Sequence, residues 1–269
     1  MKKIILVTLC SLVVVVSFSQ DRTISSRQQK KNDRKEKVNQ LIKQEEEGAL
    51  IFHKQSVFGL KLTSDGYGAF YELGRLKTPT KTNLYSLEIG ERKHDKEEKL
   101  SRGDAFGLLV GNPFIYGKIN NFYYAKLGIG QQRLIGGKGN KNGVAVTALY
   151  GGGFSAGLLK PYFLDISDSR TGKRSDVKYN DNDSVFLNPS VINGASGLGK
   201  GFNELKFVPG LYAKVGMRFD YGRYNEMVSA VEVGVHAEYY SQKMPILLLQ
   251  KQRQLFLNAY AAIVFGRRR

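Results

Sequence analysis

The chain has 269 residues, enough for one large domain or two small ones, and it carries a net charge of +17. Its single cysteine, Cys10, lies in the apolar N-terminal segment, so the rest of the sequence excludes disulfides, thiolate metal sites and cysteine nucleophiles. No later segment reaches the ~18 consecutive apolar residues of a helical membrane span. An excess of basic residues often indicates nucleic-acid binding. The export signal described next instead makes the phosphate groups of lipid or lipopolysaccharide the expected anionic partner, and we expect no nucleic acid.

Residues 1–19 are typical of a secretion signal. Lys2 and Lys3 form a positive start, Ile4–Val16 form a 13-residue apolar run, and the small residues Ser17 and Ser19 suit a cleavage site after residue 19. The alternative is an uncleaved membrane anchor, but the run is shorter than the ~18–20 residues that a spanning helix needs. The sequence therefore predicts export from the cytoplasm.

Residues 20–54 form a charged leader, which we expect on the periplasmic side. Lys and Arg are mixed with Glu, and Val38, Leu41 and Ile42 give only a thin apolar stripe at helical spacing. This composition is typical of a short helix or of a flexible segment. The domain that follows, at residues 55–269, is predicted to be a β-barrel.

Eight segments of this domain alternate with the two-residue period of a β-strand. In one of them, the odd-numbered residues from Val231 to Tyr239 are mostly apolar, and the even-numbered residues from Glu232 to Tyr240 are mostly polar or glycine. This alternation reaches the ~9–11 residues with which a tilted strand crosses a bilayer. The eight expected strands are Val57–Thr63, Tyr67–Leu76, Asn83–Glu91, Asn121–Gln132, Gly143–Leu159, Leu205–Tyr221, Met227–Ser241 and Gln254–Phe265.

If both termini of the barrel lie in the periplasm, the connections between these strands alternate in length. The inner connections are short, at 77–82, 135–142 and 222–226. Three outer connections are expected as longer loops, at Arg92–Asn120, Lys160–Glu204 and Gln242–Arg253. Short periplasmic turns and long external loops are typical of outer-membrane barrels, and the tight turn around Asp65 is the exception.

The two faces of the strands differ in chemistry. The outward face would be apolar and aromatic, and the inward face carries charges of both signs beside many glycines. An eight-stranded barrel has an interior that side chains can just fill, so opposite charges there are expected to pair and plug it. The alternative is a water-soluble barrel with its apolar face inward. The predicted luminal network contains Lys61, Glu72, Glu88, Lys126, Lys214, Arg218, Glu232, His236 and Glu238.

The last expected strand resembles the C-terminal segment that the barrel-assembly machinery reads in outer-membrane barrels. It alternates apolar residues and includes Tyr260, Ile263 and Phe265, although Gly266–Arg269 follows the final aromatic. From Ser56 to Arg269 the pattern resembles the small outer-membrane β-barrel domain proteins, including the PorT-like group. The resemblance implies an eight-stranded antiparallel barrel, and some members of that group assist the type 9 secretion system. It implies no catalytic residue.

Three features raise the question of chemistry. His236 lies near Glu232 and Glu238, but a lipid A-modifying enzyme needs a histidine and a serine at the lipid-facing rim, so a luminal polar network is favoured. Asp165–Ser184 is rich in acids and amides, but its spacing matches no calcium loop, and we expect no metal site. The apolar stretch Pro245–Leu249 could extend a hairpin, contact lipid or bind a partner.

These observations predict a non-enzymatic outer-membrane barrel without a cofactor. It would act as a structural or interaction protein through its external loops, with a protein partner in a secretion or other envelope complex. The rival functions are a lipid A-modifying enzyme and a small-solute channel.

Overall fold

A computed structural model describes residues 31–32, 34–35, 52–103, 109–138, 143–167, 172–179, 186–197, 199–223 and 226–269. The predicted signal peptide lies outside these residues. Of the predicted leader, Lys31, Asn32, Arg34 and Lys35 are helical, and residues 52–54 belong to the part described below. The chain divides into two units, Met1–Glu46 and Glu47–Arg269. Within the described residues, no helix is long and apolar enough to cross a membrane.

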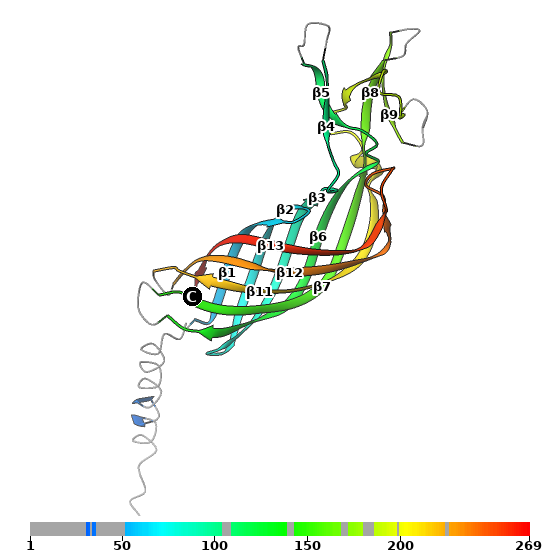
Figure 1. Ribbon diagram of the computed structural model, residues 1–269. Coiled ribbons are helices and arrows are strands. Elements are labelled where there is room, and N and C mark those ends of the chain that lie inside the picture. The colour runs from blue at the N-terminus through cyan, green and yellow to red at the C-terminus, as the bar shows by residue number, and fades with distance from the viewer. Residues whose placement is uncertain are drawn as a thin grey trace, which may run out of the picture. The chain divides into compact units, whose positions relative to one another are not determined.

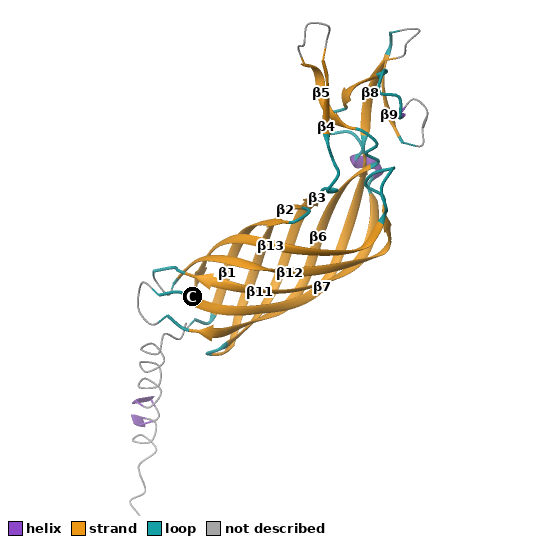
Figure 2. Ribbon diagram, viewed as in Figure 1, coloured by secondary structure: helices purple, strands orange, loops and turns teal. Residues whose placement is uncertain are grey.

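Eight antiparallel strands of the second unit close a barrel (Figures 1 and 2). The predicted fold class is confirmed, and each expected strand corresponds to one barrel strand. Around the ring the order is β1, β13, β12, β11, β7, β6, β3 and β2, and β2 pairs again with β1. The bounds are β1 Lys54–Thr63, β2 Gly66–Thr78, β3 Lys81–Arg92, β6 Asn120–Gly136, β7 Ala145–Pro161, β11 Lys206–Asp220, β12 Met227–Met244 and β13 Arg253–Arg268.

Several strands are longer than the alternation in the sequence indicated. β6 continues to Gly136 and β12 to Met244. β13 continues to Arg268, so the expectation that Gly266–Arg269 forms a tail beyond the last strand is wrong. Pairing with β1 from Thr63 back to Gln55 holds the end of β13 in the sheet, which residue type alone does not reveal.

The barrel has two different ends, which we call inner and outer. The inner end carries both termini of the barrel, where the backbone N–H groups of His53 and Lys54 donate to the carbonyl of Arg269 at 2.8 Å. It also carries the shorter connections 79–80, 137–144 and 221–226. The outer end, opposite the C-terminus, carries the two long connections after β3 and β7 with the additional strands (Figure 1). The third outer connection, expected to be longer, is only 245–252 and equals the inner connection 137–144 in length, because β12 continues to Met244.

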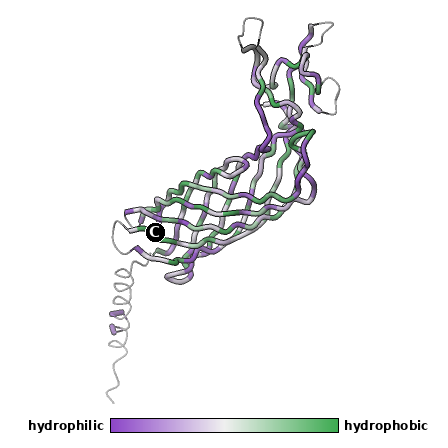
Figure 3. Tube along the Cα trace, viewed as in Figure 1, coloured by the Kyte–Doolittle hydropathy of each residue, from purple (hydrophilic) through white to green (hydrophobic). Residues whose placement is uncertain are grey.

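Side chains alternate between the lumen and the outer surface along every barrel strand. Leu60, Phe154 and Leu257 are 59%, 74% and 70% exposed, and they represent a continuous apolar outer face. Glu72 and Arg218 point the other way and are fully buried. The same alternation appears as changing hydropathy along the barrel trace (Figure 3).

Two of the long outer connections contain regular structure, although we expected loops. The connection after β3 contains β4 (Lys99–Gly103) and β5 (Leu109–Ile115). The connection after β7 contains β8 (Phe163–Ser167), β9 (Arg174–Lys178), β10 (Ile192–Ala195) and the short 3₁₀ helix η1 (Phe202–Glu204). These strands have four to seven residues, too few for a clear period, and the partner of β10 is β8, 26 or more residues earlier in the chain.

Candidate functional site

The lumen is filled by three groups of paired polar side chains, beginning with an upper network near the outer end. The Glu88 carboxylate pairs with the ammonium groups of Lys61 and Lys126, the latter at 2.8 Å. Lys126 also pairs with Glu238. All four side chains are at most 5% exposed. Each charge therefore has an opposite charge in contact, as burial in a barrel requires.

Arg92 extends the upper network from the end of β3. Its guanidinium pairs with Asp65 in the β1–β2 turn and with Glu238 on β12. Nε2 of His236 lies 3.1 Å from Arg92 Nη2 and 3.3 Å from Glu238. Nδ1 of His236 has no partner within the described part of the chain. The histidine is thus a buried member of an ion network inside the lumen.

A middle network joins opposite walls of the barrel. Glu72 on β2 accepts from Lys214 at 2.7 Å and from Arg218 at 2.5 Å, both on β11. Arg218 also donates to Glu232 at 2.5 and 2.9 Å. The Tyr260 hydroxyl donates to the second oxygen of Glu232 at 2.8 Å. Both carboxylates are therefore bonded on both oxygens, which is the condition for tolerating buried charge.

A basal network lies at the inner end. Arg268 pairs with Asp220 at 2.6 Å and donates to Gln55 at 3.0 Å. Lys138, in the β6–β7 connection, lies 3.7 Å from Asp220 and donates to the carbonyl of Gly222. Burial lowers the pKa of the Lys138 ammonium, and Asp220 opposes that shift. The inner mouth is thus crossed by paired side chains as well.

An apolar cluster closes the outer end of the lumen, and we call it the cap. It includes side chains from five barrel strands and from the connection after β12. Its buried members are Phe122, Tyr124, Leu159, Val208, Tyr240, Met244, Ile246, Leu247 and Phe256. The Arg92 guanidinium lies 5.1 Å from the Phe256 ring centroid and 5.3 Å from that of Tyr124, so the cap rests on the upper network.

The apolar stretch Pro245–Leu249 provides part of this cap. Ile246 and Leu247 are 5% and 6% exposed, and they are held by backbone bonds from Ile119 to Ile246 and between Leu248 and Gly117. For these two residues, none of the three expected roles holds, because their side chains pack inward over the lumen. Leu249 is 73% exposed and remains on the surface.

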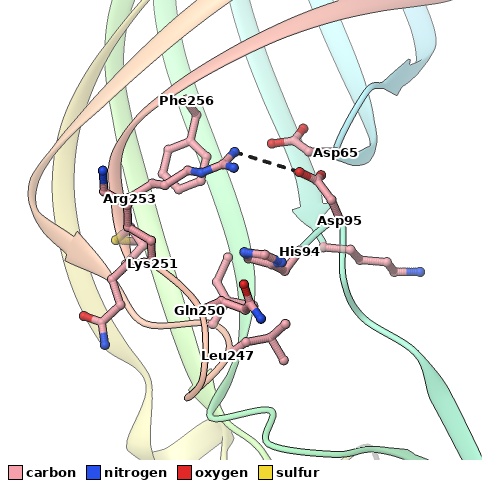
Figure 4. Close-up of a pocket in the computed structure, with 12 residues that line it drawn as sticks. Asp65, His94, Asp95, Leu247, Gln250, Lys251, Arg253 and Phe256 are labelled. Carbon is pink, nitrogen blue, oxygen red and sulfur yellow. Dashed lines mark ion pairs between the residues drawn. The ribbon is translucent and has the colours of Figure 1, made fainter.

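A small pocket lies beside the cap at the outer end (Figure 4). Arg253 and Asp95 point toward each other across it at 3.9 Å, and both are more than half exposed. The His94 ring accepts a hydrogen bond from the backbone N–H of Lys96 at 3.2 Å, so it stabilises the turn in which it lies. The cavity volume is about 20 Å³, room for about one water molecule. The pocket is too small for an organic substrate.

The two long outer connections fold together, and we call β4, β5 and β8–β10 with their connecting segments the head. Phe114 from the first connection packs into one core with Leu164, Ile166, Phe186 and Ile192 from the second. Leu164, Phe186 and Ile192 are fully buried. The head therefore has a core of its own, separate from the lumen.

Hydrogen bonds join the two connections to each other. The Tyr116 hydroxyl donates to the carbonyl of Leu187 at 2.9 Å, and the Tyr162 hydroxyl accepts from the N–H of Ile115 at 3.1 Å. Burial raises the pKa of the Tyr162 phenol, which keeps it neutral. Bonds of this kind across two connections hold the head in one arrangement.

The acid-rich segment Asp165–Ser184 forms no metal site in its described part. Asp165 pairs with Arg174 at 3.9 Å, and Asp176 pairs with Lys200 and accepts from Ser196 at 2.6 Å. The described residues contain no group of three potential His, Cys, Asp or Glu ligands. The remaining acids of the segment, including Asp168 and Asp181, lie outside the described residues.

The structure places all nine predicted luminal residues inside the barrel. Eight of them form ion pairs in the upper or middle network, and His236 contacts Glu238 at 3.3 Å. Of the predicted assembly segment, Tyr260 faces the lumen, whereas Ile263 and Phe265 are about half exposed on the outer face. The prediction missed Asp65, Arg92, Asp220 and Arg268. Asp220 lies within an expected strand and shares the parity of Lys214 and Arg218, so the sequence could have identified it. Arg92 and Arg268 lie beyond the expected ends of their strands.

No family model matches the chain, and no curated protein sequence matches it. Among solved structures, it is similar to small outer-membrane β-barrel proteins. One is Neisserial surface protein A, at 8% identity and TM-score 0.35, over 80% of this chain and 94% of that one. A second is the N-terminal β-barrel domain of Pseudomonas aeruginosa OprF, at 10% identity and TM-score 0.35, over 80% of this chain and 98% of that one.

A third similar structure is Ail, the attachment invasion locus protein of Yersinia pestis, at 10% identity and TM-score 0.35, over 81% of this chain and 99% of that one. Another structure of Ail contains the heparin analogue sucrose octasulfate. Identities this low transfer no residue role to this chain.

Proposed function

We propose that this protein is a plugged outer-membrane barrel that acts, without catalysis, as a structural or interaction protein through its head. The observation that carries the proposal is the folded head, whose shared apolar core joins two connections at the outer end of a filled barrel. A barrel with no role beyond spanning the membrane would need only short outer turns. Loops that fold on a rigid barrel are a common location for binding function.

The membrane location is supported by the outer face of the barrel. Its apolar side chains are too continuous for contact with water, since soluble proteins rarely expose apolar patches beyond a few hundred Å². A closed antiparallel barrel also pairs its backbone N–H and C=O groups internally, as hydrocarbon requires. In this location the N-terminal signal directs export, the inner end faces the periplasm, and the head faces outward.

The filled lumen argues against both rival functions. Among the described residues, three paired networks and the cap cross the lumen in succession, whereas a channel needs a wet interior. His236 is 3% exposed inside the barrel, away from the lipid-facing rim where a lipid A-modifying enzyme would need it.

The partner that we propose is a protein of an envelope complex, and the resemblance to the PorT-like group makes the type 9 secretion machinery the first complex to examine. Lipid and lipopolysaccharide surround the barrel in this proposal. During biogenesis, the barrel-assembly machinery would read the last strand, with Ile263 and Phe265 on its outward face.

The test is affinity purification of the native protein from outer membranes. Leu164→Asp places a charge in the head core and should release a stoichiometric protein partner, because the head cannot bury an unpaired carboxylate. Leu249→Asp is the matched control, since that side chain is exposed outside the head. Retention of the partner by Leu164→Asp, or purification of the wild type alone, would contradict the proposal. Heat-dependent electrophoretic mobility verifies that each barrel is folded.

A further inference from the structure

A basic groove lies on the outer face of the barrel at its inner end. It crosses β1, β2 and the end of β13 and has a cavity volume of about 450 Å³. Its lining includes the basic side chains of Lys54, Arg75, Arg267 and Arg269, beside the apolar faces of Tyr71 and Leu73. The groove is separate from the head and from the lumen.

The strand register arranges these side chains in tiers. Lys54 on β1 lies directly opposite Arg75 on β2. One step toward the outer end, the small Ser56 lies between Arg267 on β13 and Leu73 on β2. Because Ser56 is much smaller than its two neighbours, it forms the floor of the groove.

The next tier is aromatic. Phe58 on β1 lies between Phe265 on β13 and Tyr71 on β2, and all three are about half exposed. Aromatic side chains next to basic ones are typical of the boundary between hydrocarbon and lipid headgroups.

The basic side chains of the groove lack the partners that the luminal charges have. Lys54, Arg75 and Arg267 are exposed, and none of them forms an ion pair with another described residue. Guanidinium groups bind phosphate oxygens in pairs of parallel hydrogen bonds, which makes them specific for such anions. The groove thus offers unpaired phosphate donors beside an apolar wall.

We propose that this groove binds an anionic phospholipid of the inner leaflet, with its phosphate between Arg75 and Arg267 and an acyl chain along Tyr71 and Leu73. The site rests on the proposed outer-membrane location of the barrel. Its position at the inner end assigns it to phospholipid rather than to lipopolysaccharide, which would meet the barrel at the end that carries the head. The apolar wall favours a lipid over a free phosphate ion.

The test is a titration of the full-length protein, folded in zwitterionic detergent, with phosphatidylglycerol, phosphatidylcholine and inorganic phosphate, read by native mass spectrometry. Arg75→Gln with Arg267→Gln should weaken phosphatidylglycerol binding by about 25-fold, because each basic residue near an anionic headgroup contributes about fivefold. Ser56→Phe keeps every charge but fills the groove, and it should also abolish preferential binding.

The matched control is Lys81→Gln with Arg133→Gln, which removes two facing basic residues at the same end of the barrel but outside the groove. It should change binding less than about twofold if the groove is specific. An equal loss in the control would overturn the proposal, as would equal affinity for phosphatidylcholine. Displacement of the lipid by an equimolar amount of inorganic phosphate would overturn it in favour of a phosphate site.

The proposed membrane location is tested separately by insertion into vesicles and by protection from protease. A protein that does not insert contradicts that location. A protein that inserts but shows no lipid preference overturns the groove alone.

Discussion

Replacement of Glu72 by Gln tests whether the middle network holds the barrel together. Glu72 is fully buried and is the carboxylate that faces both Lys214 and Arg218 across the lumen. Arg218 keeps Glu232 in the variant, but the ammonium of Lys214 loses the one ion pair that it forms with a described residue. Removal of one partner of a buried pair costs about 3–5 kcal/mol, so we expect a loss of about 3 kcal/mol.

The assay measures the free energy of unfolding by urea titration of the protein in lipid vesicles. The electrophoretic mobility of the protein reports the folded fraction at each urea concentration. Glu72→Gln should lower it by about 3 kcal/mol, roughly a 150-fold change in the folded fraction. The double variant with Lys214→Met removes both members of the pair and should recover most of this loss, since no uncompensated charge remains.

Two results would refute this reasoning. A loss below about 1 kcal/mol for Glu72→Gln would mean that the pair behaves like an exposed one. Additive effects of Glu72→Gln and Lys214→Met would mean that the two side chains are not energetically coupled.

Three further measurements test the lumen and the cap. In planar bilayers the wild-type protein should give no steady current, and an open-channel conductance would contradict a filled lumen. Gly59→Ala should destabilise the barrel by about 1–3 kcal/mol because its Cβ would lie 2.3 Å from Cζ of Phe70, whereas Gly136→Ala meets nothing within 4 Å and serves as the control in the same urea titration. Leu247→Ala should cost about 2–4 kcal/mol, and Leu249→Ala should stay within about 0.5 kcal/mol, so equal effects in that titration would mean that the cap is not packed.

The barrel was predictable because its signal is local and repeated. Each strand carries its own two-residue alternation, and a run from Val231 to Tyr239 needs no knowledge of its partner to be read as a strand with two faces. The head was not predictable in this way. A strand such as β8 has only five residues. Leu164 and Ile166 are buried by packing with Phe114 from another connection and with Phe186 and Ile192 from later in the same one.

The reasons why the sequence did not reveal some members of the luminal networks are also specific. Arg92 ends β3 one residue beyond the expected strand, and Arg268 lies three residues beyond the expected end of β13. Both are held in the sheet by pairing with neighbouring strands, and the residue type alone does not reveal this pairing. Asp65 lies in a turn, so no alternation could have assigned it to the lumen, and only the closed ring brings it to Arg92.

The pairs that cross the lumen connect strands far apart in the chain. Glu72 on β2 meets β11, and Arg92 on β3 meets β12, and in each case the partners lie four positions apart around a ring of eight. Such pairs form only when the first hairpin and the last strands have come together. A slip of one residue in any of these strands would turn its charges toward hydrocarbon, and a slip of two would leave them facing the wrong partners. Only the correct register pairs these charges with one another, so the networks favour the correctly closed ring over rings with a shifted strand.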